Sequence, residues 1–251
     1  MIELFKEIWA TVQHNKLRTT LTGFAVGWGI FILIFLLGAG NGLINAQMHQ
    51  SERFLANSIV VFGGVTSKPH NGFDRGRRIS LENRDLLTTT NNFEENIQET
   101  GATLWKPGNT FSLGANYIAS QNLCGAYPVK VKIDKIEIVH GRFINDIDLR
   151  EKRKVIVLTQ TQAKELSRDV AALLGKYIKV NDTMFRVVGI SKDDKSGENN
   201  TAHSPFTTIS TIYNYGHKVD RIEFTFGGVS TEEESDAFED RYRASINANH
   251  D

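Results

Sequence analysis

The stretch "NKLRTTLTGFAVGWGIFILIFLLGAG", residues 15–40, is typical of a membrane-spanning helix. From Thr19 to Ser51 the chain contains no Asp, Glu, Lys or Arg. The most apolar part, Leu21 to Leu43, would form a helix of roughly 34 Å, enough to cross the hydrocarbon layer of a bilayer. A cleaved signal peptide usually has a shorter apolar region, and an uncharged run this long is rare in soluble domains. The sequence therefore favours a retained span over both alternatives.

The charges on either side of this span predict its orientation. Lys6, Lys16 and Arg18 precede it, whereas the first charges after it are Glu52 and Arg53. An excess of basic residues marks the cytoplasmic end of a membrane helix. We therefore expect a cytoplasmic N-terminus in the inner membrane and, in a bacterium with two membranes, a main domain in the periplasm.

The span also contains small residues spaced four apart. Such spacing lets a second helix approach closely, although glycine is common in membrane helices generally. Because three such pairs occur in one span, the sequence favours helix–helix packing. The residues predicted to serve this packing are Gly23, Ala25, Gly27, Gly29, Gly38 and Gly42.

The segment before the span, "MIELFKEIWATVQHNK", is amphipathic. Phe5, Ile8, Trp9 and Val12 fall at positions i, i+3, i+4 and i+7, which places them on one face of a helix. Such a helix can lie flat in the membrane interface, with Trp9 at the level of the headgroups. Trp9, together with the basic residues on this side, is expected to form the cytoplasmic flank.

The remainder of the chain predicts an α+β fold. We expect residues 1–18 to form the interfacial helix, 19–50 the membrane helix and its extension, and 51–251 an outer domain with a β-rich part at about 110–190. Strands are predicted from apolar alternation and helices from polar capping residues. Ser80 is a candidate N-cap of one helix, and Ser230 with Glu233 matches a capping box before another. Strands are expected at 57–64, 129–141, 154–160, 176–190 as a hairpin turning at Asn181-Asp182, and 220–226; helices are expected at 79–102, 162–166 and 230–249.

The composition excludes several classes of protein. The chain has 29 basic and 29 acidic residues, and this zero net charge argues against a nucleic-acid binder. A mean hydropathy of −0.28 argues against a protein with many membrane spans. The sequence has no phosphate-binding loop of the G-x-x-x-x-G-K-[ST] type, no H-E-x-x-H and no G-x-S-x-G. It therefore predicts no catalytic residue, no cofactor site and no metal site.

Three further features have only weak chemical interpretations. The lone Cys124 is expected to be a small buried apolar residue. Two acidic pairs, Asp146 with Asp148 and Asp193 with Asp194, could in principle bind calcium. Neither pair lies in a twelve-residue loop with a central glycine, so we expect solvated acids. "GRFINDIDLREKRK" is expected to be a surface turn whose basic residues are offset by nearby acids. The acids are Asp146, Asp148, Asp193 and Asp194, and the basic residues are Arg142, Arg150, Lys152, Arg153 and Lys154.

Taken together, the span, "GRFINDIDLREKRKVIVLTQTQAKEL" and "LLGKYIKVNDTMFRVVGI" resemble the MacB/FtsX-type ABC transporter permeases. The order of elements is similar: a Gly-Arg-Phe turn, an acidic step, a buried Val-Ile-Val-Leu strand, a short helix and two further strands. "SPFTTISTIY" and the closing helix fit as well, so the resemblance covers essentially the whole chain. One departure is Ala172-Leu173-Leu174-Gly175-Lys176, where family members often have Pro-x-Gly-Lys.

The resemblance implies an N-terminal transmembrane helix followed by a MacB-like periplasmic core domain of mixed strands and helices. It implies two permease copies, each served by a separate ATP-binding subunit, and a possible periplasmic or outer-membrane partner. ATP-driven motion would pass through the spans to the outer domains for export, extraction or signalling. Such permeases carry three further spans, so the sequence is expected to be the N-terminal part of a longer permease.

Two other classes remain as alternatives. A stand-alone membrane-anchored periplasmic binding or sensor domain would also explain one span and the missing ATP-binding motif. A membrane-anchored enzyme is less favoured, because the sequence offers no convergent set of titratable residues.

Overall fold

The computed structural model describes residues 15–51, 57–67, 74–193, 201–227 and 232–250, together with Glu3, Lys6, Trp9, Gln13 and Gly72. The chain divides into two compact units, Met1–Arg53 and Phe54–Asp251. The elements along the chain are α2 (Lys16–Ser51), β1 (Ser58–Phe62), β2 (Leu81–Glu82), α3 (Asn83–Asn92), β3 (Ile97–Leu113), β4 (Asn116–Ala126), α4 (Lys130–Ile133), β5 (Ile138–Gly141), α5 (Asp146–Arg150), β6 (Val155–Thr159), α6 (Gln160–Leu166), the 3₁₀ turn η1 (Ala171–Leu173), β7 (Tyr177–Val180), β8 (Thr183–Ser191), β9 (Thr201–Pro205), α7 (Phe206–Ile212), β10 (Lys218–Val219), β11 (Arg221–Phe226) and α8 (Glu232–Asn247).

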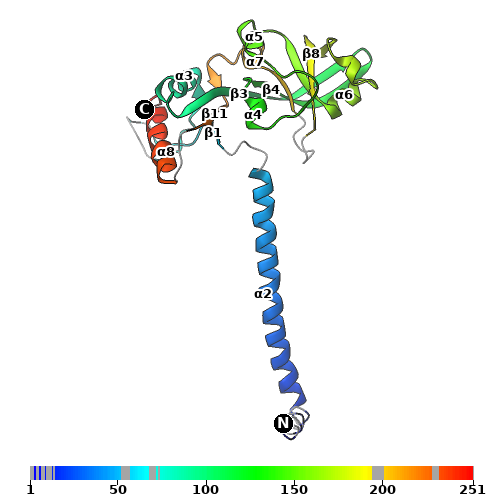
Figure 1. Ribbon diagram of the computed structural model, residues 1–251, viewed down its shortest axis with the longest axis vertical. Helices are drawn as coiled ribbons and strands as arrows, with labels where there is room; N and C mark the ends of the chain where they lie inside the picture. Colours follow the sequence, from blue (N-terminus) through cyan, green and yellow to red (C-terminus); the bar gives the residue numbers. More distant parts are fainter. Residues whose placement is uncertain are drawn as a thin grey trace. The chain divides into compact units, whose positions relative to one another are not determined.

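The first unit is dominated by the single long helix α2 (Figure 1). Its 36 residues correspond to roughly 54 Å of helix. The part Lys16–Gly42 is long and apolar enough to cross a membrane, and its apolar side chains are exposed on all sides. A helix that is apolar all round and has no protein neighbour is suited to lipid.

The predicted interfacial helix falls mostly outside the described residues. Glu3, Lys6, Trp9 and Gln13 are helical and exposed. Phe5, Ile8 and Val12, which define the apolar face, lie outside the described part of the chain, so that interpretation stays a prediction.

In the second unit, nine of the described strands form one sheet. Following the strand pairs, β3, β4, β9, β6, β8 and β7 form a closed circuit, because β7 pairs with both β8 and β3. These six strands make a barrel, and closing a sheet in this way removes free edges. The long strand β3 leaves the barrel and continues the sheet through β11 to β1 (Figure 1).

The sequence explains why these strands are positioned as they are. All five residues of β6 are buried, as expected of a strand enclosed on both faces. β7 and β8 alternate between buried and exposed residues over the length of their hairpin. Asn181 adopts φ 50° at the turn, a left-handed conformation that asparagine tolerates. Gly141, in the Gly-Arg-Phe turn, has φ 75°, and a Cβ there would overlap the Val188 carbonyl oxygen.

The end of the sheet formed by β1, β11 and β3 is covered by α3 and α8. Phe224 of β11 and Phe93 after α3 both pack on rings of α8, at 6.2 and 5.6 Å from Phe238. Tyr242, one turn further along α8, lies 5.3 Å from both Phe93 and Phe224. This aromatic cluster fixes α8 to the sheet.

Several sequence predictions are confirmed. The strands expected at 57–64, 154–160 and 220–226 are β1, β6 and β11, and the hairpin at 176–190 is β7–β8. The helices expected at 162–166 and 230–249 are α6 and α8. The proposed capping residue Ser230 lies outside the described residues.

The helix predicted at 79–102 is wrong in its second half and in its cap. The helix covers only Asn83–Asn92, and its N-cap is Glu82, which forms a capping box with Asp85, rather than Ser80. From Ile97 onward the chain is strand β3, because it pairs with β11 and then β4. β11 is distant in sequence from residues 97–102, so this tertiary pairing overrides their local helical pattern.

The strand predicted at 129–141 is also partly wrong. Residues Lys130–Ile133 form the short helix α4, and only Ile138–Gly141 is strand. The helical turn places Lys130 and Ile133, three residues apart, in buried positions, which an alternating strand would not do. Residues 103–126, for which no helix or strand was predicted, form most of the β3–β4 hairpin.

Candidate functional site

The residues predicted to pack membrane helices all lie in α2. An added Cβ at Gly23, Gly27, Gly38 or Gly42 would meet no atom within 4 Å. At 3.6 residues per turn these four glycines fall within roughly 100° of the helix circumference, whereas Ala25 and Gly29 lie on the other side. The two sets could therefore contact two different neighbouring helices, which stays a prediction.

Aromatic rings form a second stripe on α2. Successive ring centroids of Phe24, Trp28, Phe31 and Phe35 are 5.8, 5.5 and 6.4 Å apart. This stripe is contiguous with the glycine side of the helix. At the predicted cytoplasmic flank, Lys6, Trp9, Lys16 and Arg18 are exposed.

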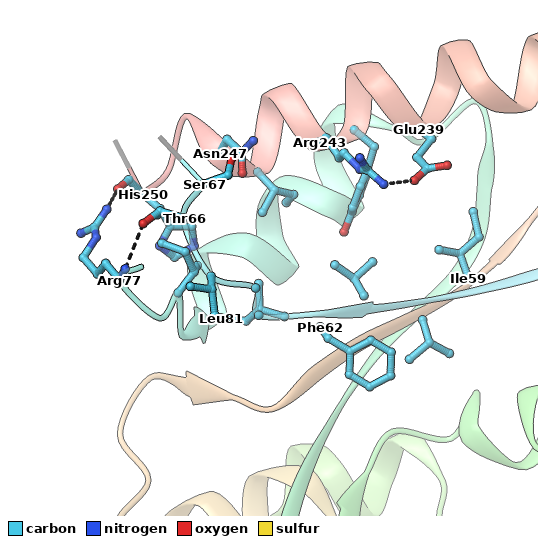
Figure 2. A pocket seen from close by; sticks show the side chains of 18 of the residues that line it. Ile59, Phe62, Thr66, Ser67, Arg77, Leu81, Glu239, Arg243, Asn247 and His250 are labelled. Atoms are coloured by element: carbon cyan, nitrogen blue, oxygen red, sulfur yellow. Dashed lines mark hydrogen bonds and ion pairs between the residues drawn. The ribbon is translucent and has the colours of Figure 1, made fainter. Parts of the chain in front are cut away.

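In the outer domain, a groove of about 950 Å³ lies between α8 and β1 with the loop that follows it (Figure 2). Ile59 and Val61 of β1 and Phe238, Tyr242 and Ile246 of α8 give it apolar walls. The polar residues that line it include Thr66, Arg77, Glu239, Arg243 and His250. Glu239 and Arg243 form an ion pair across one turn of α8.

A buried carboxylate contacts His250, one of the residues that line this groove. Asp85, at the start of α3, is fully buried and accepts a hydrogen bond from the Glu82 backbone N–H at 2.8 Å. Its two oxygens also lie 2.9 Å from Asn249 Nδ2 and from His250 Nε2, in the turn that follows α8. Thr89 and Tyr242 share a further hydrogen bond at 2.8 Å. We call the contacts of Asp85 with Asn249 and His250 the Asp85 clasp.

Arg77 connects the loop after β1 to the same turn. Its guanidinium donates to the His250 carbonyl oxygen at 2.8 Å, and its backbone N–H donates to Thr66 Oγ1 at 3.0 Å (Figure 2). The loop after β1, the start of α3 and the end of α8 are therefore held together by directed polar contacts.

A second polar cluster lies on the opposite face of the same sheet. Lys130 Nζ of α4 is 2.7 Å from Glu223 Oε1 of β11 and 2.9 Å from Asp134 Oδ2. The side chains of Lys130 and Glu223 are 5% and 2% exposed, so this ion pair is shielded from water. Removing either partner would leave a buried charge with incomplete compensation.

Two potentially reactive residues lie near this ion pair. Cys124 and His203 are paired in register on β4 and β9, and both are buried. Burial raises the pKa of the Cys124 thiol to about 12, so the sulfur is a protonated thiol at neutral pH. Cys124 is thus the buried apolar residue that the sequence predicted, and a thiolate nucleophile is not available there.

The pH dependence of stability should report on His203. Burial, together with the nearby charge of Lys130, lowers the pKa of its ring from 6.5 to about 3. The unfolded chain therefore takes up a proton near pH 6.5 that the folded chain refuses until about pH 3. We therefore expect the free energy of unfolding to decrease as the pH is lowered through this window. The contribution of His203 should approach about 1.4 kcal/mol per pH unit.

This prediction is checked by guanidinium unfolding of the full chain in detergent micelles between pH 6 and pH 4. In the variant His203→Asn, the free energy of unfolding should depend less steeply on pH, by the contribution of one proton. In the variant His217→Asn, at an exposed site, this dependence should match that of the parent. Equal slopes for the parent and His203→Asn would show that the folded domain protonates His203.

Among the described residues, no group of three or more His, Cys, Asp and Glu side chains could hold a metal ion. The expectation of solvated acids is wrong for Asp148, which is buried, caps α5 and pairs with Arg142 at 2.5 Å. Asp146 is exposed as expected, Asp193 accepts hydrogen bonds from Thr161, and Asp194 lies outside the described residues.

Sequence reasoning missed the residues that form both polar clusters. Asp85 lies among other polar residues in the sequence, with no local sign that it is buried. Glu223 carried a usable signal, because a carboxylate in the middle of the apolar strand "RIEFTF" needs a buried partner. Nothing local indicated that this partner is Lys130, 93 residues earlier.

Comparison with known families now identifies the fold. The family model of the MacB-like periplasmic core domain matches residues 19–244. The chain belongs to this family. The resemblance seen in the sequence and the α+β fold with one N-terminal apolar helix are thereby confirmed. The apolar helix and the periplasmic-domain family together point to a membrane-anchored protein.

Relatives match over most of this chain. The macrolide export ATP-binding/permease protein MacB of Aggregatibacter actinomycetemcomitans is 20% identical over 226 residues, which are 88% of this chain and 34% of that protein. The MacB protein of Wolinella succinogenes is 26% identical over 216 residues, covering 84% of this chain and 32% of that protein. The chain thus spans about a third of the length of these relatives.

Solved structures share the MacB-like fold. The periplasmic region of MacB from Actinobacillus actinomycetemcomitans gives a TM-score of 0.64 at 21% identity, covering 79% of this chain and 86% of that one. The extracellular domain of the ABC-type transporter YknZ from Gram-positive bacteria gives 0.61 at 15% identity, covering 77% and 95%.

Proposed function

We propose that this chain is the N-terminal part of a permease subunit that carries ATP-driven motion from the cytoplasm to the periplasm, for export, extraction or signalling. The observation that carries this proposal is the pairing of a membrane-length helix with a MacB-like core domain in one chain. The domain bounds 1–18, 19–50 and 51–251 and the β-rich part at 110–190 belong to the same proposal.

The contacts in the outer domain support a mechanical role. β1, the first strand after α2 in the sequence, pairs with β11 over five residues. β11 in turn packs against α8, where Phe226 and Phe238 lie 4.7 Å apart. The Asp85 clasp holds the end of α8, so a displacement of β1 is passed to α8 through rigid, packed contacts.

The proposed assembly has four kinds of partner. ATP is bound and hydrolysed by a separate ATP-binding subunit, although the matched MacB relatives are named as ATP-binding and permease proteins together. A second permease copy packs on the glycine pattern of α2. A periplasmic or outer-membrane protein meets the outer domain, and inner-membrane lipid surrounds the span, with the N-terminus in the cytoplasm.

A stand-alone membrane-anchored binding or sensor domain is the second candidate. The groove of about 950 Å³ between β1 and α8 favours it, because this volume falls in the range of small-molecule sites. Such a domain would bind its ligand without any response to ATP.

The test uses the complete reading frame, purified in lipid nanodiscs with the proteins that stay bound to it. Spin labels at Lys164→Cys, an exposed site on α6, report the distance between two copies. We expect ATP with vanadate to change this distance and ADP to leave it unchanged. No ATP-binding partner and no response would instead support the anchored binding domain, and ATP hydrolysis by this chain alone would overturn both.

A further inference from the structure

The outer surface of the barrel carries exposed tyrosines among basic side chains. Tyr117 and Tyr177 are 71% and 58% exposed. Cross-strand pairing forms one row in which Tyr117 lies opposite Ser112, Ser112 opposite Lys179, and Lys179 opposite Met184. Directly opposed residues point to the same side of a sheet. We call this surface the basic face: Tyr117, Tyr177, Lys179, Met184 and Arg186.

The charges of the basic face are largely uncompensated. Arg186 lies opposite Tyr177, and its backbone N–H donates to the Lys154 carbonyl oxygen at 2.9 Å. Lys179 pairs at 3.6 Å with Asp182, whose side chain is fully exposed. Within the described ranges, Arg186 has no acidic partner. Tyr, Met and Arg are enriched at protein–protein interfaces, so this composition favours a protein over a lipid surface.

A complementary surface lies on α8. Glu233, Asp236 and Asp240 are exposed and occupy positions i, i+3 and i+7, which places them on one side of the helix. None of the three has a basic partner among the residues that the structure describes. Ala237 and Ala244 lie beside them and are also exposed. We call these three acids the acidic stripe.

The two surfaces cannot meet within one domain. At its start β3 pairs with β11, on which α8 packs, and at its end it pairs with β7 of the basic face. From Glu99, opposite Thr225, to Ser112, opposite Lys179, the strand covers roughly 40 Å. Figure 1 shows α8 and β8 at opposite ends of the domain. A chain with zero net charge thus separates uncompensated charges of opposite sign.

We propose that the acidic stripe of one copy docks on the basic face of a second copy of this chain. A twofold axis makes this contact twice, because each copy presents both surfaces. The small side chains of Ala237 and Ala244 leave room for the rings of Tyr117 and Tyr177, which supply the apolar contact. The charges steer and orient the approach. This inference rests on the second permease copy in the proposed function and specifies how the outer domains meet.

The test is a reciprocal charge reversal on the full chain in nanodiscs. One variant carries Glu233→Lys, Asp236→Lys and Asp240→Lys, and the other carries Lys179→Glu and Arg186→Glu. Contact is measured as disulfide crosslinking between Ala244→Cys on one copy and Lys176→Cys on the other. Cys124 does not interfere because its thiol is buried.

Either reversed variant paired with itself should crosslink about tenfold more slowly than the parent, since like charges then face each other. Mixing the two variants should restore the parent rate, because both contacts of the twofold pair become attractive again. This restoration also shows that both variants fold. The control Lys132→Glu with Arg150→Glu, exposed sites outside both surfaces, should keep the parent rate.

Parent-like crosslinking in either variant alone, or a mixture that stays slow, would overturn the inference. A second crosslink at Ile32→Cys, within α2, reports whether the copies pair in the membrane. If that crosslink persists while the outer one is insensitive to charge, the docking of the outer domains is wrong but the proposed function stands.

Discussion

Replacing Glu223 with leucine should lower the free energy of unfolding of the outer domain by about 3 kcal/mol or more, because it leaves the Lys130 ammonium buried with only part of its compensation. Glu223 Oε1 lies 2.7 Å from Lys130 Nζ, and both side chains are almost completely shielded from water. The remaining contact, with Asp134 at 2.9 Å, is to a side chain that is 27% exposed. Guanidinium unfolding of the full chain in detergent, followed by circular dichroism, measures the loss.

The matched control removes both charges. In the double variant Lys130→Met with Glu223→Leu, most of the lost stability should return, because a well-packed apolar pair often replaces a buried ion pair at no cost. The coupling free energy between the two sites then follows from a double-mutant cycle. Additive effects of the two single substitutions would show that the ion pair does not form in the folded domain.

Replacing Asp85 with alanine should lower the free energy of unfolding by about 2–3 kcal/mol, since buried donors lose their acceptor. The Glu82 backbone N–H, Asn249 Nδ2 and His250 Nε2 all converge on this carboxylate. The effect should be local as well as global. Hydrogen exchange of the turn Ala248–His250 should accelerate more than that of β6 in the barrel, because the Asp85 clasp attaches this turn to α3.

Asp182→Ala is the control for this substitution, because that carboxylate is fully exposed at the β7–β8 turn and its removal should leave stability unchanged. A uniform increase in exchange across the domain would show that Asp85 stabilises the fold without specifically holding α8. If the clasp transmits motion, Asp85→Ala should also weaken the ATP-dependent change in distance between copies, whereas Asp182→Ala should not.

The groove and the clasp together define a joint between β1 and α8. The groove has apolar walls from both elements, and Arg77 connects the loop after β1 to the turn after α8. Movement of β1 relative to α8 would therefore change the shape of the groove. Both interpretations of this domain, as a mechanical element and as a binding domain, thus depend on β1 and α8. The response to ATP distinguishes between the two interpretations.

Elements whose signals are local could be predicted from the sequence alone. The uncharged run from Thr19 to Ser51 is enough to specify a membrane-length helix, because apolar runs of that length are rare in soluble domains. The continuous apolar run in "KVIVLTQ" predicted β6, and the Asn181-Asp182 turn predicted the β7–β8 hairpin. Both signals depend only on neighbouring residues in the chain. The order of these elements was sufficient to indicate the family.

Features that depend on partners far apart in the sequence emerge only in the folded domain. Residues 97–102 have a local helical pattern but become strand, because they pair with β11, which is far along the chain. The same holds for the polar clusters: Asp85 meets His250 across 165 residues, and Lys130 meets Glu223 across 93. A charged side chain in the sequence is compatible with water or with burial, and the fold selects burial only where it brings a partner of opposite charge or a set of donors within hydrogen-bond distance.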